Sequence, residues 1–200
     1  GQIFATLSIF LKVFICVIIL HILYTAGLFI FAGGLSGKNP FVCMKNQIPG
    51  YFTALGTQSS AATIPINIEC AKRNGTSPEI REFVVPLCAT IHLAGSIITI
   101  TSCVVTVLMM HNMSYGISTI FPFIMVLGVA MVAAPGAPGG AIMSALPFLG
   151  MAGIASSSPM ASLLIALYIT QDSFGTAANV SGDNAIAIIV DWIYHKFIKK

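Results

Sequence analysis

The sequence predicts an all-α integral membrane protein that combines spanning helices, broken helices and two opposed re-entrant helical hairpins. Three observations predict it. Of the 200 residues, 56% are hydrophobic and only 8% are charged, whereas about 25% of the residues of a soluble domain are charged. The apolar residues form long runs, and a spanning helix needs about 20 of them. Gly- and Pro-rich stretches separate these runs where a soluble protein would have polar loops.

The first half of the chain yields three elements. Residues 1–36 are a long apolar helix that ends at the stop signal AGGLSGKNP. Residues 41–73 are weakly apolar on both sides of the stretch TQSSAATIP, and neither side is long enough to span, which predicts a hairpin. Residues 79–110 are apolar but carry the polar stretch CATIHLAGS. We therefore expect this helix to unwind near Gly95.

Two elements follow in the second half. Residues 116–153 contain an apolar helix, the stretch APGAPGG and a short apolar return, so they predict a second hairpin. Residues 159–198 predict one last helix, continuous from Met160 to Phe197. Hairpin tips expose backbone N–H and C=O groups, so each tip must be buried in protein or line a wet cavity. A pair of interrupted segments of this kind points to the binding site of a transporter.

The distribution of basic residues predicts the orientation. Lys and Arg are absent between Arg81 and Lys196, and eight of the nine basic residues would be cytoplasmic if the two polar connections and the C-terminus face inward. The eight are Lys38, Lys45, Lys72, Arg73, Arg81, Lys196, Lys199 and Lys200. The first hairpin then enters from the cytoplasm and the second from outside. We therefore expect their tips to meet near the middle of the membrane.

The last predicted helix carries a polar stripe. Asp172, Thr176, Asn179 and Asp183 are spaced by 4, 3 and 4 residues, which places them within roughly 60° of one another on a helix. A charge in hydrocarbon is costly and usually functional. The stripe supplies oxygen atoms for a substrate ammonium and for a hard cation. The alternative is a polar seam that joins helices without binding anything.

Two further groups are candidate partners of the stripe. The TQSSAATIP tip offers hydroxyls and free N–H groups, which suit a substrate carboxylate, although these residues are also suited to helix packing. His92 lies in the predicted helix break. It is a buried core histidine, a neighbour of a cation site, or a proton carrier.

Four stretches, GTQSSAATIP, FVVPLCATIHLAGS, APGAPGGAIM and GTAANVSGDNA, together resemble the dicarboxylate/amino acid:cation symporters, the glutamate transporter family. The resemblance covers nearly the whole chain and corresponds to the C-terminal half of such a protein. It implies a partial transport domain: helix six (1–36), hairpin one (41–73), broken helix seven (79–110), hairpin two (116–153) and helix eight (159–198). It also implies cation-coupled symport of an amino acid by an elevator mechanism, and not an enzyme.

The resemblance assigns roles to individual residues by motif. The implied substrate-binding residues are Ser59, Ser60, Ser96, Pro135, Gly136, Asp172, Thr176 and Asn179. The implied metal ligands are Thr90, His92, Asn179 and Asp183. The implied cofactor is Na⁺, with H⁺ as the alternative coupling ion. The implied partners are an amino-acid substrate and the lipid bilayer, with a homotrimer when the protein is full-length and no nucleic acid. The implied location is the inner membrane, multi-pass, with a cytoplasmic C-terminus.

Departures from the family pattern bear on the substrate. The Asn-Met-Asp-Gly-Thr motif of the family reads HLAGS here, so its aspartate is Ala94 and its asparagine is His92. The arginine that pairs with acidic substrates is Gly175, and the hairpin-one position that supplies an alternative arginine is Gln58. A second substrate carboxylate would be buried without a partner, which is costly. We therefore expect a neutral or non-acidic amino acid.

Other classes remain as alternatives. The protein is a symporter of dicarboxylates or acidic amino acids, a passive channel lined by the stripe, or a truncated product without function. An intramembrane enzyme would need two carboxylates at one bond. Asp172 and Asp183 lie about 16 Å apart along a helix at ~1.5 Å per residue, too far to act together.

Overall fold

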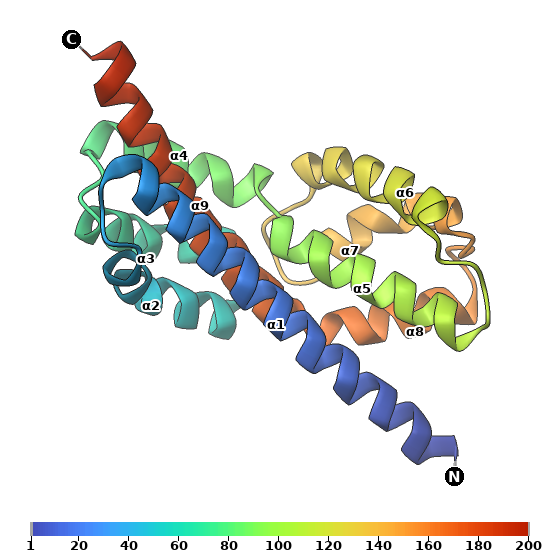
Figure 1. The fold of residues 1–200 in the computed structure, drawn as a ribbon. Helices are drawn as coiled ribbons and strands as arrows, with labels where there is room; N and C mark the ends of the chain where they lie inside the picture. The colour runs from blue at the N-terminus through green and yellow to red at the C-terminus, as the bar shows by residue number, and fades with distance from the viewer. Residues whose placement is uncertain (1, 200) are drawn as a thin grey trace.

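The computed structural model describes residues 2–199, and within them all regular structure is helical (Figure 1). Gly1 and Lys200, the latter counted above in the basic tail, lie outside the described residues. The longest element is α1, Gln2–Ser36, which ends where Gly37 adopts a φ of 71°. Such a positive φ favours glycine, so the AGGLSGKNP stretch stops the helix as its composition predicts.

A pair of helices, α2 (Pro40–Thr57) and α3 (Ser60–Arg73), forms the first hairpin. Asn39 caps α2 by accepting hydrogen bonds from the N–H groups of Phe41 and Val42. The turn consists of Gln58, in a left-handed conformation with φ 52°, and Ser59, whose hydroxyl caps α3. The tip is therefore only two residues long, and both lie in the stretch predicted to form it.

The next pair, α4 (Pro78–Ile91) and α5 (Ala94–Met110), is one helix interrupted at His92 and Leu93. The interruption lies next to Gly95, where unwinding is expected. A Cβ atom on Gly95 would lie 2.4 Å from the backbone oxygen of Gly175. The absence of a side chain thus lets the start of α5 pack directly against the backbone of the last helix.

The second hairpin is less regular than the first. It runs from α6 (Ile117–Ala130) through the 3₁₀ turn η1 (Met131–Ala133) and a loop to α7 (Gly140–Ala145) and the 3₁₀ segment η2 (Leu146–Ala152). Gly139, at the end of the loop, has a φ of 71°. The APGAPGG stretch therefore forms an extended tip, which a short helix follows.

The last predicted helix is not continuous, which corrects the sequence prediction. It consists of α8 (Pro159–Ile169), α9 (Asp172–Ile193) and one π-helical turn, η3 (Tyr194–Ile198). At the break, the Thr170 hydroxyl and the Gln171 amide both donate to the Leu167 carbonyl, at 2.7 and 3.0 Å. Side chains that bond to the preceding turn compete with the helical backbone pattern. Asp172 is consequently the first residue of a helix and lies at a helix end.

Helix α9 is the centre of the structure and contacts α1, α2, α3, α4 and α5 (Figure 1). Figure 1 shows α1 running beside α9, with α2, α3 and α4 gathered at one end and α5 to α8 at the other. The largest buried apolar cluster joins α5, α6, α7, η2 and α8, with Phe123 and Tyr168 fully buried in it. Both helix breaks and both hairpin tips thus meet near the start of α9.

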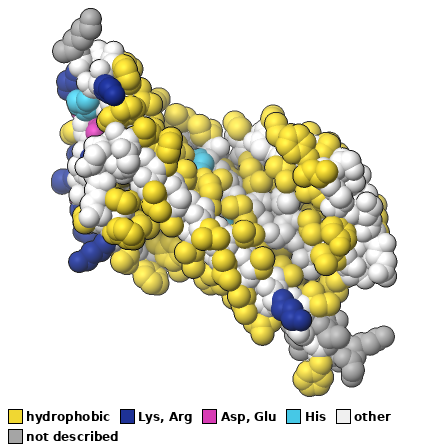
Figure 2. Space-filling view, viewed as in Figure 1, with side chains coloured by type: hydrophobic (Ala, Val, Ile, Leu, Met, Phe, Trp, Pro, Cys, Tyr) yellow, Lys and Arg dark blue, Asp and Glu magenta, His cyan; other side chains and the backbone are white. Residues whose placement is uncertain are grey.

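The outer surface is apolar. Large hydrophobic side chains on α1, among them Leu11, Ile15 and Leu23, are largely exposed, and Figure 2 shows hydrophobic side chains over much of the visible face. By length and composition, Ser8–Ser36 and Pro78–Met110 could each cross a membrane. The dark blue Lys and Arg side chains in Figure 2 gather mainly at the end that carries the C-terminus. An apolar surface with basic residues gathered at one end is typical of an integral membrane protein.

Candidate functional site

A small cavity lies where the two hairpin tips and the α4–α5 break approach α9. It is lined by Gln58, Ser60, Leu93, Ser96, Pro135, Gly136, Ala137, Ala141, Tyr168, Asp172, Thr176 and Asn179. Its volume is about 10 Å³, roughly what one water molecule requires. Among the lining residues, Asp172 is the only one with a charged side chain. The cavity is therefore a closed polar site with one carboxylate and no basic group.

The Asp172 carboxylate connects the last helix to the second hairpin. Its Oδ1 accepts a hydrogen bond from the Tyr168 hydroxyl at 2.6 Å, and its Oδ2 accepts one from the backbone N–H of Gly139 at 2.8 Å. Asp172 is only 5% exposed. A buried carboxylate is costly unless it has partners, and one of its two partners belongs to the tip that covers the cavity. A movement of that tip therefore changes the environment of Asp172.

The Asn179 side chain holds the broken helix against α9. Its Oδ1 accepts from the N–H groups of Gly95, at 2.7 Å, and Ser96, at 3.4 Å, and its Nδ2 donates to Ser96 Oγ at 3.0 Å. These N–H groups belong to the first turn of α5, which has no helical partner for them. Asn179 thus caps α5 from a neighbouring helix and fixes Ser96 at the cavity wall.

The two hairpin tips touch. The Ser59 hydroxyl donates to the carbonyl oxygen of Gly136 at 2.6 Å, and the Ala61 N–H donates to the same oxygen at 3.3 Å. A Cβ atom on Gly136 would lie 3.0 Å from the Ala89 carbonyl oxygen. The closed arrangement therefore depends on a glycine and two hydrogen bonds at the tips, in addition to the bond from Gly139.

Most of the predicted substrate residues come together in this cavity. Seven of them line it: Ser60, Ser96, Pro135, Gly136, Asp172, Thr176 and Asn179. Ser59 lies beside it through its bond to Gly136. Two other lining residues, Gln58 and Tyr168, were not among the predicted substrate-binding residues, although Gln58 was noted as the position of an alternative arginine. A Tyr four residues before Asp172 is the signal that was available, because residues i and i+4 share one face of a helix.

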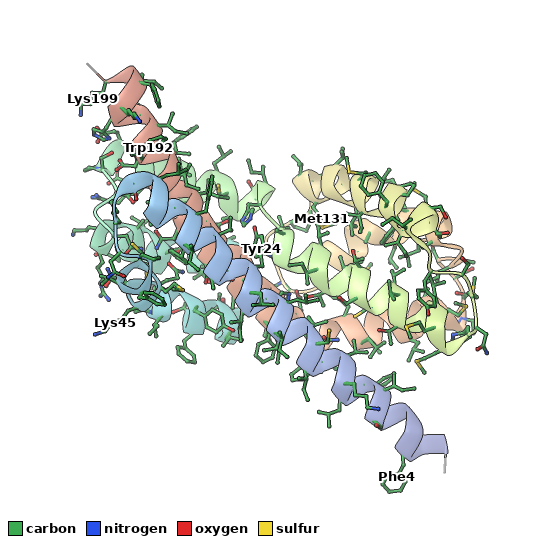
Figure 3. All side chains as sticks on the ribbon, viewed as in Figure 1. Phe4, Tyr24, Lys45, Met131, Trp192 and Lys199 are labelled. Carbon is green, nitrogen blue, oxygen red and sulfur yellow. The ribbon has the colours of Figure 1, made fainter. Side chains whose placement is uncertain are left out.

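The predicted cation residues do not come together in the same way. His92 Nδ1 lies 2.9 Å from Asp183 Oδ1, and His92 Nε2 lies 2.7 Å from the Tyr24 hydroxyl. Asp183 is 1% exposed, and its Oδ2 has no hydrogen-bond partner among the described residues. This chain of three side chains joins α1, the α4–α5 break and α9. Tyr24, labelled near the middle of α1 in Figure 3, was not among the candidates.

Na⁺ requires several oxygen ligands around one point, as hard cations do. Thr90 is exposed and its hydroxyl donates to Leu87 O within its own helix. The Oδ1 of Asn179 already accepts two N–H groups, and His92 presents nitrogen to Asp183. Within residues 2–199, no group of three or more His, Cys, Asp and Glu side chains could hold a metal. The four residues do not fit one cation shell in this arrangement, and their role as metal ligands stays a prediction.

Gly175 lies outside the cavity wall. A Cβ atom there would lie 3.2 Å from Thr99 Oγ1 and 3.5 Å from the backbone of Gly95. The residue faces α5, so its small size serves helix packing. Gln58, in contrast, lines the cavity and donates from Nε2 to Ser173 Oγ at 2.9 Å.

An unpredicted network of buried amides holds the first hairpin to α9. Asn184 Nδ2 donates to Gln47 Oε1 at 2.5 Å, and Gln47 Nε2 donates to Asn67 Oδ1 at 2.9 Å. Asn67 Nδ2 completes the connection by donating to the Val180 carbonyl at 2.9 Å. These three side chains are at most 2% exposed. Because each amide bonds to the next, hairpin one and α9 are expected to behave as one unit.

Comparison with known proteins gives one family. The sodium:dicarboxylate symporter family model matches residues 1–193. The serine/threonine transporter SstT of Acinetobacter baylyi is 32% identical over 160 residues, which cover 77% of this chain and 39% of the relative. Excitatory amino acid transporter 1 of Rattus norvegicus is 29% identical over 163 residues, which cover 81% of this chain and 30% of the relative. The chain thus spans less than half the length of these curated relatives.

Proposed function

The chain belongs to the sodium:dicarboxylate symporter family, and from this premise we propose that it forms the substrate-binding part of a cation-coupled amino-acid symporter. The family match and the helical structure confirm the all-α membrane fold class, and the transporter relatives support a transporter instead of an enzyme. The proposal concerns what the cavity binds and how it opens. It rests mainly on the absence of a basic side chain from the cavity lining.

The substrate we propose is a small amino acid without a charged side chain, such as serine or threonine. Its ammonium group pairs with Asp172, and its carboxylate accepts hydrogen bonds from the serine-rich tip that contains Ser60. A substrate with a second carboxylate would leave that group without a cationic partner in a buried site. Such a charge costs about 3–5 kcal/mol, or roughly 100-fold or more in affinity. The serine/threonine function in the name of one relative agrees with this preference.

Substrate entry requires the second hairpin tip to move. A cavity of about 10 Å³ is too small for any amino acid. Its hairpin-two side is formed by Pro135, Gly136 and Ala137 of the tip and by Ala141 of α7. Opening breaks the bond from Gly139 to Asp172 and those made by the Gly136 carbonyl. A substrate ammonium can take the place of the Gly139 N–H at Asp172. Occupancy of the site and the position of the tip are then linked.

The remaining parts of the proposal follow from the family. They are Na⁺ as the coupling ion, with H⁺ as the alternative, an elevator movement of this part of the protein, a homotrimer when full-length, and an inner-membrane location with a cytoplasmic C-terminus. The basic end seen in Figure 2 supports that orientation.

Uptake into proteoliposomes tests the proposal. With an inward Na⁺ gradient, we expect radiolabelled serine or threonine to accumulate above its external concentration, with no accumulation when choline replaces Na⁺ at the same pH. Unlabelled aspartate is expected to compete roughly 100-fold more weakly than serine. Flux that only equilibrates the label would indicate a passive channel. Aspartate that competes as well as serine would contradict the proposed substrate.

A further inference from the structure

A second cavity lies at the basic end of the molecule, between the end of α1 and the end of α9. It is lined by Ser36, Lys38, Ile188, Asp191, Trp192, His195 and Lys196 and has a volume of about 320 Å³. This is far more than the ~10–15 Å³ that one water needs. In Figure 3, Trp192 and Lys199 are labelled at this end of α9. The cavity is remote from the closed polar site, which lies near the start of α9.

Two ammonium groups in this cavity lack an acidic partner. Among residues 2–199, neither Lys38 nor Lys196 has a carboxylate oxygen within 4.0 Å. Lys38 is half-buried and donates to the Asn74 carbonyl at 2.5 Å, and the Lys196 ammonium lies 4.5 Å from the centre of the Trp192 ring. Both retain donors for an anion. Lys199 differs, because its bond to Glu79 at 2.9 Å raises the pKa of that ammonium.

The carboxylate in the cavity wall is engaged through one of its two oxygens. Asp191 Oδ1 accepts from the N–H of Ser77 at 2.9 Å and from its hydroxyl at 2.6 Å. His195 Nδ1 lies 3.5 Å from the same oxygen. Asp191 therefore serves to hold the end of α9 to the α3–α4 connection. Of the side chains that line the cavity, the two lysines are the ones with a permanent positive charge, and their chemistry selects a phosphate or another anion.

The position of the cavity selects the source of that anion. Ser36 is the last residue of the long apolar helix, and Phe31 near its end is 58% exposed. Phe197, next to Lys196, is 63% exposed. A tryptophan beside lysines at the end of an apolar helix is typical of the membrane interface. Basic pockets between helices on the cytoplasmic side bind lipid head groups, and exposed aromatic side chains contact the lipid below them.

We propose that this cavity binds the phosphate head group of an anionic phospholipid, with Lys38 and Lys196 as its ligands and Trp192 at the level of the head group. The site is independent of the amino-acid site and of the identity of the transported substrate. Each of the two lysines that contact the head group is expected to contribute about fivefold to binding. Zwitterionic lipids carry the same phosphate but also a positive group, so they bind more weakly here.

Trp192 is the single tryptophan of the 200 residues and reports on the site directly. The experiment uses the protein with any tryptophan outside these residues replaced by phenylalanine, reconstituted in phosphatidylcholine vesicles. One fifth of the lipid is either brominated phosphatidylglycerol or brominated phosphatidylcholine, whose bromine atoms quench nearby tryptophan. We expect the brominated phosphatidylglycerol to quench the tryptophan with about 25-fold selectivity over the brominated phosphatidylcholine, about fivefold from each lysine.

Substitutions of single lysines distinguish a specific lipid-binding site from non-specific attraction by surface charge. Lys196→Gln and Lys38→Gln are each expected to lower the selectivity about fivefold, with quenching normalised to the same variant in unbrominated lipid. Lys38→Gln leaves the surroundings of the tryptophan ring intact, so it guards against a local effect on fluorescence. The control is Lys45→Gln, which changes an exposed lysine on α2 (Figure 3) and is expected to keep the selectivity.

Equal quenching by both brominated lipids, or an equal loss of selectivity in the Lys45 variant, would overturn the proposal. Displacement of the lipid by 10 mM inorganic phosphate would also overturn it, because the site would then be one for a free anion.

Discussion

Replacing Gln58 by Arg should allow the closed polar site to accept aspartate. Gln58 lines the cavity from the tip of hairpin one, and its Nε2 lies 2.9 Å from Ser173 Oγ, next to Asp172 in the chain. Arg is similarly unbranched, so the φ of 52° at this position adds little new strain. Its guanidinium can bind a second carboxylate through two hydrogen bonds. This guanidinium pairs with the side-chain carboxylate of aspartate, which offsets most of the roughly 3–5 kcal/mol cost of leaving that charge buried and unpaired.

Competition against labelled serine uptake measures the effect. In the unaltered protein we expect aspartate to compete roughly 100-fold more weakly than serine, from about 3 kcal/mol at 1.4 kcal/mol per tenfold. In Gln58→Arg the gap should shrink by at least about tenfold. Gln58→Met, of similar length and without charge, is the matched control and should gain nothing for aspartate. The reasoning is refuted if the Arg variant transports serine normally and aspartate competes no better than before.

Three other substitutions test the packing around the site, each by thermal unfolding in detergent. Gly95→Ala should lower the melting temperature by several degrees, because its new Cβ would lie 2.4 Å from a backbone oxygen and overpacking costs about 1–3 kcal/mol. Gly128→Ala is the control, because a Cβ atom there would have nothing within 4 Å. Equal melting temperatures for the two variants would contradict the close approach at Gly95. Asn184→Leu should cost about 1–3 kcal/mol because Gln47 loses its buried donor, and an unchanged melting temperature would mean that the amide network is not stabilising. Tyr24→Phe removes one hydroxyl bound to a histidine at 2.7 Å, with an expected loss of about 1 kcal/mol; a gain in stability would count against that bond.

The polar stripe and the meeting of the hairpin tips were predictable because they depend on local pattern. Spacings of 4, 3 and 4 residues place Asp172, Thr176, Asn179 and Asp183 on one face of any helix. All four lie on α9: Asp172, Thr176 and Asn179 line the cavity, and Asp183 contacts His92 at the α4–α5 break. The tips could be located from Gly, Pro and Ser composition, and charge counting gave them opposite directions of entry. The structure brings Ser59 and Gly136 within 2.6 Å.

What sequence pattern did not reveal depends on contacts between distant residues. The partner of His92 is Tyr24, 68 positions away, and nothing in either neighbourhood predicts it. At the α8–α9 break two side chains bond to one carbonyl, and neither Gly nor Pro stands at residues 170–171 to signal an interruption. Gly175 was interpreted through the substrate, whereas its closest neighbours are on α5. Such packing roles are decided by tertiary contacts and have no periodic signal.

The most direct test of the account is amino-acid binding by Asp172→Asn. Asn can still accept from the Gly139 N–H and can donate to the Tyr168 hydroxyl, so the fold is expected to persist while the negative charge is lost. Breaking a buried, hydrogen-bonded charge pair costs about 2–5 kcal/mol, which is at least about 30-fold in affinity. Glu69→Gln, an exposed acid on α3, is the control. Equilibrium binding of labelled serine should fall at least 30-fold in the Asp172 variant and stay unchanged in the control, whereas unchanged binding in a folded Asp172 variant would contradict the account.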